Sequence, residues 1–194
     1  RPFKAVQTGG PSGGCVPAQY IDMPIDFDSL TEAGAMMGSG GMVVMNEDSC
    51  MVDVAKYFLD FTQKESCGKC TFCRIGTWHM LSILKRLTLG EAQDGDLELL
   101  EQLSEDIRKG SLCGLGKTAP NPVLAMLRHF RSEIESHVID KSCPAGRCKA
   151  LIRFEINENC IGCTICAQKC HVDAIYPLPY QIHEIDQDKC TKCD

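Results

Sequence analysis

The stretch "CIGCTICAQKC", residues 160–170, places four cysteines in the spacing C-x2-C-x2-C-x3-C. A structural zinc site takes cysteines in pairs, because one C-x2-C unit already supplies two of the four ligands of a tetrahedral ion. Three consecutive C-x2-C turns suit a four-iron cubane better, since its irons occupy separate corners. The spacing therefore predicts that Cys160, Cys163 and Cys166 hold an iron–sulfur cluster, and that Cys170 is a ligand of a second cluster.

A shortened copy of this pattern stands at the end of the sequence. It reads "DKCTKCD", residues 188–194, and contains Cys190 and Cys193. Each copy follows a short segment of alternating apolar and polar residues, at 152–156 and 181–186, which predicts two strands. The unit of strand, C-x2-C and loop is thus an internal repeat.

Residues 153–194 resemble a bacterial-type ferredoxin domain with two 4Fe-4S clusters. The family has Pro after its fourth cysteine, where this sequence has His171. The resemblance implies ligands for two clusters: Cys160, Cys163 and Cys166 for the first, and Cys170, Cys190 and Cys193 for the second. It also implies one further cysteine for each cluster. We expect these to follow Asp194, so that the sequence is a fragment with a truncated ferredoxin-like domain.

Cysteine is the unusual feature of the composition, with 14 in 194 residues. Most of them lie in C-x2-C clusters, which favours metal ligation over disulfides and a reducing, cytoplasmic setting over a secreted one. The net charge of -6, with both signs mixed along the chain, excludes a nucleic-acid-binding protein. No apolar run is long enough to cross a membrane.

Residues 51–140 carry the apolar period of amphipathic helices. Four helices are predicted, the last beginning at Asn121 and running through His137. Their short connections predict a four-helix bundle. Trp78 and the Phe residues on the apolar stripes are predicted to lie in its core.

The fold class that follows is an α+β multidomain fragment. Residues 1–50 read as turns and short strands, one of them at 42–45. The glycine-rich stretches there suit turns better than a phosphate-binding loop, because neither has a strand–loop–helix frame or a P-loop lysine. The predicted parts are a small β domain at 1–50, an iron–sulfur helical bundle at 51–140, a cysteine-containing linker at 141–152 and the ferredoxin-like domain at 153–194.

A second group of cysteines lies between the first two predicted helices. The stretch "ESCGKCTFCRIGT", residues 65–77, contains Cys67, Cys70 and Cys73 in a triple C-x2-C register. No fourth cysteine is near in sequence. Cys113, in "SLCGLG", is the only cysteine between this group and the linker, and a bundle can bring the two loops together. We therefore predict that these four cysteines hold one 4Fe-4S cluster.

Both loops resemble the NADH-binding flavoprotein subunit of respiratory complex I and its hydrogenase relatives. Phe72 and Ile75 stand where that family usually has Pro and Glu. The resemblance implies that the four cysteines hold a 4Fe-4S cluster close to a flavin. The stretches "GGPSGGC" and "GSGGMVVM" also look like that family's small β-grasp domain.

A ferredoxin-like tail on such a bundle resembles the flavoprotein subunit of NAD(P)-coupled, often electron-bifurcating, iron hydrogenases. That resemblance implies an upstream part that binds FMN and NAD(P)H. It implies as partners a thioredoxin-like 2Fe-2S subunit and a catalytic hydrogenase or dehydrogenase subunit. The function implied is electron relay, with no bond making in this segment.

Four further residues of types that bind metals lead to a separate hypothesis, a zinc site. Cys143 and Cys148 have a C-x4-C spacing that fits zinc, Cys50 begins the first predicted helix, and His137 ends the last. The first and last helices of a bundle can be neighbours, so these four residues predict a zinc site. The alternative is unligated thiols and a core histidine. Cys15 is predicted to be a buried small hydrophobe.

Three rival functions remain open at this stage. The first is a zinc-stabilised interaction module with no redox role. The second is the flavoprotein subunit of an NAD-dependent formate dehydrogenase, which shares the same arrangement of parts. The third is a free-standing ferredoxin-like carrier, which the helical bundle disfavours.

Overall fold

The computed structural model describes residues 2–193, which form two compact units divided between Leu151 and Ile152. The predicted β domain and helical bundle belong to one unit. The predicted linker at 141–152 lies in that unit up to Leu151. No helix within residues 2–193 combines the length and the apolar character needed to cross a membrane.

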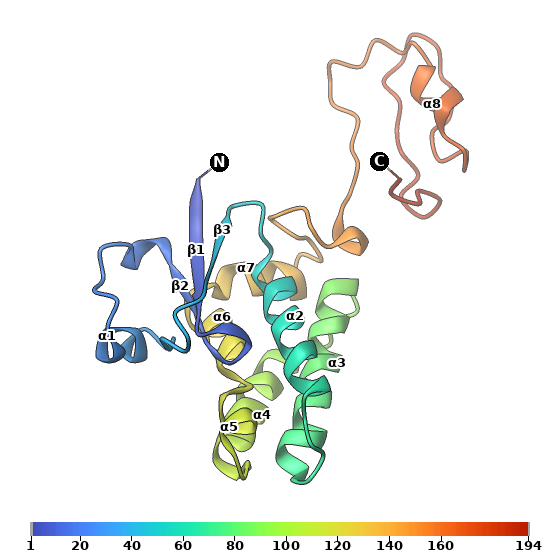
Figure 1. Cartoon of the computed structure of the whole chain (residues 1–194). Helices are drawn as coiled ribbons and strands as arrows, with labels where there is room; N and C mark the ends of the chain where they lie inside the picture. Colours follow the sequence, from blue (N-terminus) through green and yellow to red (C-terminus); the bar gives the residue numbers. More distant parts are fainter. Residues whose placement is uncertain (1, 194) are drawn as a thin grey trace. The chain divides into compact units, whose positions relative to one another are not determined.

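The first unit begins with a three-stranded antiparallel sheet (Figure 1). Strand β1 (Phe3–Thr8) lies between β2 (Cys15–Pro17) and β3 (Met42–Asn46), which confirms the predicted strand at 42–45. Two 3-10 turns, η1 (Gly10–Ser12) and η2 (Ala18–Tyr20), and the short helix α1 (Phe27–Glu32) complete this part.

Cys15 is buried beside the sheet, as predicted. Its Sγ lies 2.8 Å from Gln7 Oε1, and because a carbonyl oxygen accepts, the thiol donates this hydrogen bond. Burial raises the pKa of Cys15 to about 12. Cys15 is therefore a neutral core residue.

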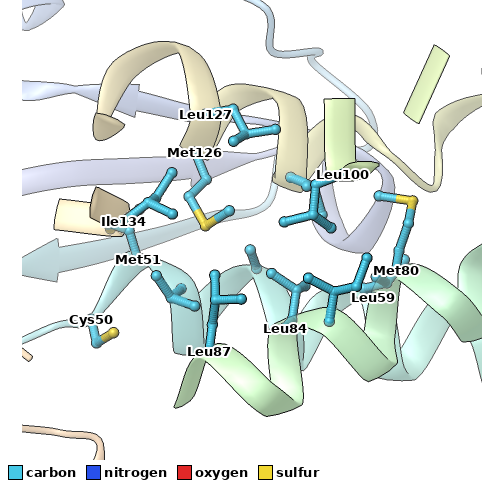
Figure 2. Packing of buried hydrophobic residues seen from close by; sticks show 14 of the residues in the cluster. Cys50, Met51, Leu59, Met80, Leu84, Leu87, Leu100, Met126, Leu127 and Ile134 are labelled. Atoms are coloured by element: carbon cyan, nitrogen blue, oxygen red, sulfur yellow. The ribbon is translucent and has the colours of Figure 1, made fainter. Parts of the chain in front are cut away.

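Four helices pack around one hydrophobic core: α2 (Met51–Lys64), α3 (Thr77–Leu89), α4 (Asp96–Gly110) and α6 (Asn121–His129). Figure 2 shows Leu59, Leu84, Leu100 and Met126 facing one another in this core. Cys50 lies at one edge of the same cluster, next to Met51. The core therefore reaches the N-terminal end of α2.

The predicted fourth helix is in fact two helices, so this prediction was wrong. At Phe130 the backbone leaves helical geometry, with φ -127° and ψ 35°, and α7 (Arg131–Val138) continues beyond it. Neither Pro nor Gly marks this break in the sequence. The change of direction turns Glu133 and His137 towards the start of α2.

The prediction of a buried Trp78 was also wrong, since its exposed fraction is 53%. Just before it runs a π-helical turn, η3 (Phe72–Gly76), which leads directly into α3. A π turn has i→i+5 hydrogen bonds and so carries extra residues per turn. An apolar stripe read through it at the α-helical period therefore falls out of phase. Phe58, on the regular helix α2, is buried as predicted.

The π turn lies close against the end of α4. A Cβ placed on Gly110 would lie 2.4 Å from Cδ2 of Phe72, so only glycine permits this approach. The next helix, α5 (Gly114–Thr118), follows directly. The close contact places the cysteine loop before α3 next to the loop between α4 and α5. The unit ends with a 3-10 turn, η4 (Lys149–Leu151).

The second unit has little regular structure. Residues 152–193 contain one short helix, α8 (Ile165–Lys169), and one isolated antiparallel bridge, Ile175 to Ile185. The two strands predicted at 152–156 and 181–186 are therefore not formed. An alternating pattern makes a strand only where a neighbour completes the hydrogen-bond ladder, and residues 152–156 have no such neighbour among the described residues. Ala167, Ala174 and His183 are buried in this unit.

Candidate metal centres

One group of side chains in the first unit has the geometry of a single-ion site. The ligand atoms of Cys50, His137, Cys143 and Cys148 all lie within 4.8 Å of one another, and no other such group occurs among the described residues. Sγ of Cys50 and Sγ of Cys148 are 3.7 Å apart. Nε2 of His137 lies 3.3 Å from the first sulfur and 3.5 Å from the second. The structure thus brings together four residues that span 98 positions of the sequence.

The pKa of Cys50 bears on whether this group can bind a metal ion. The pKa of the Cys50 thiol lies far above its ordinary value. The hydrogen bond to Cys148 is the largest cause, and burial is the second. Without metal, the Cys50 thiol therefore keeps its proton at neutral pH. A metal cation bound to it would replace that proton and offset the thiolate charge. This Cys/His group can therefore bind a metal ion.

A buried ion pair holds the backbone on both sides of Cys50. Nζ of Lys4 lies 2.7 Å from Oε2 of Glu133 and donates to the Ser49 carbonyl at 2.6 Å. Oε1 of Glu133 accepts from the Met51 N–H at 2.8 Å. Both charged side chains are about nine-tenths buried. Strand β1 and helix α7 thus jointly fix the residue that begins α2.

Glu133 also orients the imidazole. Nδ1 of His137 lies 2.7 Å from the Glu133 carbonyl oxygen, and because a carbonyl only accepts, Nδ1 carries the proton. In the neutral ring, Nε2 then presents its lone pair to the two sulfurs, which is the arrangement of a histidine metal ligand. Sequence reasoning missed Lys4 and Glu133, because nothing in their local sequence connects them to the cysteines.

The second candidate centre is formed by the two cysteine-containing loops of the bundle. Cys67 and Cys70 precede the π turn, Cys73 lies within it, and Cys113 begins α5. Burial raises the pKa of Cys73, and neighbouring Cys70, Cys113 and Cys67 raise it further through charge repulsion. The N–H of Leu112, beside Cys113, is the largest contribution to the lowered pKa of Cys70. The two loops therefore place all four sulfurs within electrostatic range.

No three of these four sulfurs form a single-ion group in the part of the chain that the structure describes. Ligands of a four-iron cluster bind irons at separate corners and so lie farther apart than ligands of one ion. Cys67 and Cys113 are exposed, while Cys73 is buried. Their assignment to a cluster therefore stays a prediction.

The second unit contributes six cysteines, and within residues 152–193 the sulfurs of three of them have polar contacts. Sγ of Cys160 lies 3.4 Å from Nδ1 of the buried His183, and this hydrogen bond is the main reason that the pKa of Cys160 falls to about 7. The Ala174 N–H donates to Sγ of Cys170 at 3.3 Å. Nδ1 of His171 lies 3.8 Å from Sγ of Cys193.

Each of these histidines thus lies beside a candidate ligand. Sequence reasoning missed His183, although its place in an alternating segment before the last cysteines was a usable signal. The remaining three candidates are Cys163, which is exposed, and the half-buried Cys166 and Cys190.

Comparison with known families identifies the bundle segment. Residues 53–137 match the NADH-ubiquinone oxidoreductase-F iron-sulfur binding region. This chain carries the iron–sulfur binding region of that family. The matched segment contains Cys67, Cys70, Cys73 and Cys113, and it ends at His137. Cys50, Cys143 and Cys148 lie outside it.

Curated relatives of the NADH-ubiquinone oxidoreductase-F region are similar over most of this chain. The chain is 52% identical over 182 residues to the NADP-reducing hydrogenase subunit HndC of Solidesulfovibrio fructosivorans, covering 93% of this chain and 37% of HndC. It is 43% identical over 144 residues to the F 2 subunit of the NADH-quinone oxidoreductase of Rhizobium meliloti (strain 1021), covering 74% of this chain and 34% of that protein. The chain thus spans about a third of the length of the curated relatives it matches.

A solved structure agrees with this placement. The crystal structure of an NAD+-reducing [NiFe]-hydrogenase in the H2-reduced state matches with a TM-score of 0.64 and 34% identity, over 71% of this chain and 23% of that one. The match to HndC is longer than the first unit of 151 residues and so extends into the second. The homologues are subunits of NAD(P)H-linked hydrogenase and NADH-quinone oxidoreductase complexes.

Proposed function

We propose that this chain is the electron-relay part of the NADH-binding subunit of an NAD(P)-linked hydrogenase complex. The observation that carries the proposal is the packing of two loops that bring Cys67, Cys70, Cys73 and Cys113 into electrostatic range within the matched region. An iron–sulfur cluster supplies one-electron transfer when bound. The hydrogenase version is favoured over an NADH dehydrogenase or formate dehydrogenase version because the match to HndC extends into the second unit.

The proposed relay has three cluster sites. The bundle site is formed by Cys67, Cys70, Cys73 and Cys113. Two further sites draw on the cysteines of the second unit, which is proposed to be ferredoxin-like: Cys160, Cys163 and Cys166, and Cys170, Cys190 and Cys193. FMN and NAD(P)H would bind to another part of the subunit, and a thioredoxin-like 2Fe-2S subunit and a catalytic hydrogenase subunit would be the partners. So many thiolate ligands require a reducing compartment, for which we propose the cytoplasm.

Production of the protein under anaerobic conditions tests this function. We expect a brown protein whose iron and sulfide contents are nearly equal and which shows electron paramagnetic resonance signals on reduction. A colourless protein that contains zinc and neither iron nor sulfide would support the non-redox interaction module and overturn the relay.

We also propose that Cys50, His137, Cys143 and Cys148 bind one structural zinc ion. Tetrahedral zinc, with bonds of about 2.3 Å to sulfur and about 2.0–2.1 Å to nitrogen, separates two sulfurs by about 3.8 Å and sulfur from nitrogen by about 3.5 Å. The observed separations are 3.7 Å between Cys50 and Cys148, and 3.3 and 3.5 Å from these sulfurs to His137. A closed set of four protein ligands is typical of a structural site.

Glu133→Gln is expected to weaken this metal site. The amide still accepts from Met51 N–H, but Lys4 loses its buried partner, which costs about 3–5 kcal/mol of unfolding free energy. The Glu133 carbonyl that bonds His137 is retained, and the altered side chain supports only the backbone beside Cys50, so we expect a loss of metal affinity near the lower end of the roughly 10–100-fold range known for outer-shell groups. Competition with a chelator measures the affinity, and thermal melting measures the stability.

Glu135→Gln is the matched control. Glu135 lies on the same helix and pairs with Arg131 at the surface, where such a pair is worth less than about 1 kcal/mol. Equal chelator sensitivity in the two variants would show that Glu133 does not support the site.

A further inference from the structure

A buried hydroxyl lies between the two cysteine loops of the bundle without a hydrogen-bond partner. Ser111 directly follows α4 and is 3% exposed. Its own N–H bonds to the Ile107 carbonyl, but its Oγ finds no partner of acceptable geometry among the described residues. An unsatisfied buried polar group costs about 1–3 kcal/mol, so its retention needs a cause.

The atoms around Gly116 show that the Ser111 hydroxyl lies on the side of Cys73. A Cβ placed on Gly116 would lie 2.5 Å from Ser111 Oγ and 3.0 Å from Cys73 Cβ. The hydroxyl and the buried cysteine therefore approach the same point, and only glycine leaves room for both.

A second hydroxyl, on the loop that carries Cys73, contacts the sulfur of that cysteine. Oγ of Ser66 lies 3.3 Å from Sγ of Cys73 and accepts from the Gly68 N–H at 3.3 Å. The thiolate of a ligating cysteine has no proton to give. When Cys73 is a ligand, Ser66 must therefore be the donor in this contact.

We propose that Ser111 and Ser66 donate hydrogen bonds to the cysteine sulfurs of the bundle cluster and thereby raise its reduction potential. The inference rests on the proposed cluster at Cys67, Cys70, Cys73 and Cys113. Reduction adds one negative charge to the cluster and its thiolates. A donor aimed at a sulfur therefore stabilises the reduced form more than the oxidised form, and hydrogen bonds to the sulfurs are one of the means by which proteins set cluster potentials.

A potentiometric titration followed by electron paramagnetic resonance tests the proposal on the whole chain with its clusters bound. Cys113→Ala first identifies the signal that belongs to the bundle cluster. Ser111→Ala is then expected to lower the reduction equilibrium constant of that signal about tenfold, which is about 59 mV for a one-electron couple. Ser66→Ala should shift it in the same direction, the double variant should shift it further, and Ser66→Thr should restore the potential because it keeps the hydroxyl.

Ser104→Ala is the matched control. Ser104 is buried on α4, the helix that Ser111 follows, but its hydroxyl donates to the Leu100 carbonyl at 2.6 Å, so its removal should leave the potential unchanged. A bundle signal whose potential is the same in wild type and Ser111→Ala overturns the inference. A Cys113→Ala variant that loses no signal overturns the proposed cluster instead, so the two failures are distinguishable.

Melting of the metal-free chain gives a second readout. Without the cluster, Ser111→Ala removes a buried group that has no partner and should leave stability unchanged or increased. A clear loss of stability in the metal-free chain would show that Ser111 has a structural role, and would count against the proposal.

Discussion

Cys113→Ala is expected to abolish one reducible iron–sulfur signal, that of the bundle cluster, and to leave unchanged any signal that depends on residues 152–193. Cys113 begins α5 and is the single candidate ligand on its loop, whereas Cys67, Cys70 and Cys73 come from the other loop. Three thiolates leave one iron of the cube without a protein ligand, so the cluster becomes labile or loses that iron. Spectroscopy on reduction, together with iron and sulfide analysis, measures the loss.

Cys15→Ala is the control for this experiment. Cys15 is also a free cysteine, but its buried thiol donates to Gln7 and lies in the core beside the sheet. Its removal should leave every cluster signal in place. An unchanged spectrum in Cys113→Ala would show that the fourth ligand of the bundle cluster is another group.

His137→Gln is expected to release the metal ion of the Cys/His site and to destabilise the first unit. His137 is fully buried, and its ring bridges the Glu133 carbonyl and the sulfurs of Cys50 and Cys148. Loss of a bound metal belongs to the few mechanisms that cost more than about 4–5 kcal/mol of unfolding free energy. Metal analysis should find about one zinc ion per chain in the wild type and far less in the variant.

His129→Gln tests whether the effect is specific to the site. His129 is half-buried on α6, and its Nε2 bonds to the Ala33 carbonyl instead of to sulfur. We expect its zinc content to equal that of the wild type. A wild-type protein that contains no zinc, or a His137→Gln variant that retains it, would contradict the proposed site.

The helices could be predicted where apolar residues recur with the period of an uninterrupted α-helix. The segments of α2 and α4 follow the 3.6-residue period, and their apolar residues Leu59 and Leu100 are fully buried. The prediction failed at Trp78 because a π turn shifts the helical phase, and at Phe130 because no local residue type marks the break. Both failures arise from hydrogen bonding and packing that a fixed period does not represent.

The candidate sites also have features that could be predicted from the sequence and features that could not. The cysteine spacings at 67–73 and 160–170 predict iron–sulfur ligation by themselves, because neighbouring ligands on one loop are a local property of the chain. The assignment of each cysteine to a cluster stays a prediction. Ser111, Lys4 and Glu133 carry no local signal of their role, since the groups that they contact come from other elements.

The sequence by itself determined which residues are candidate metal ligands, because their types and spacings are local properties, and it placed the bundle segment in its family. Only the tertiary structure decided which distant ligands meet. Cys50 and Cys148 lie 98 positions apart in the chain and 3.7 Å apart in the fold. The physical reason is that spacing constrains neighbours through the short reach of the backbone, whereas contacts between distant residues depend on how the helices α2, α6 and α7 bury their shared core.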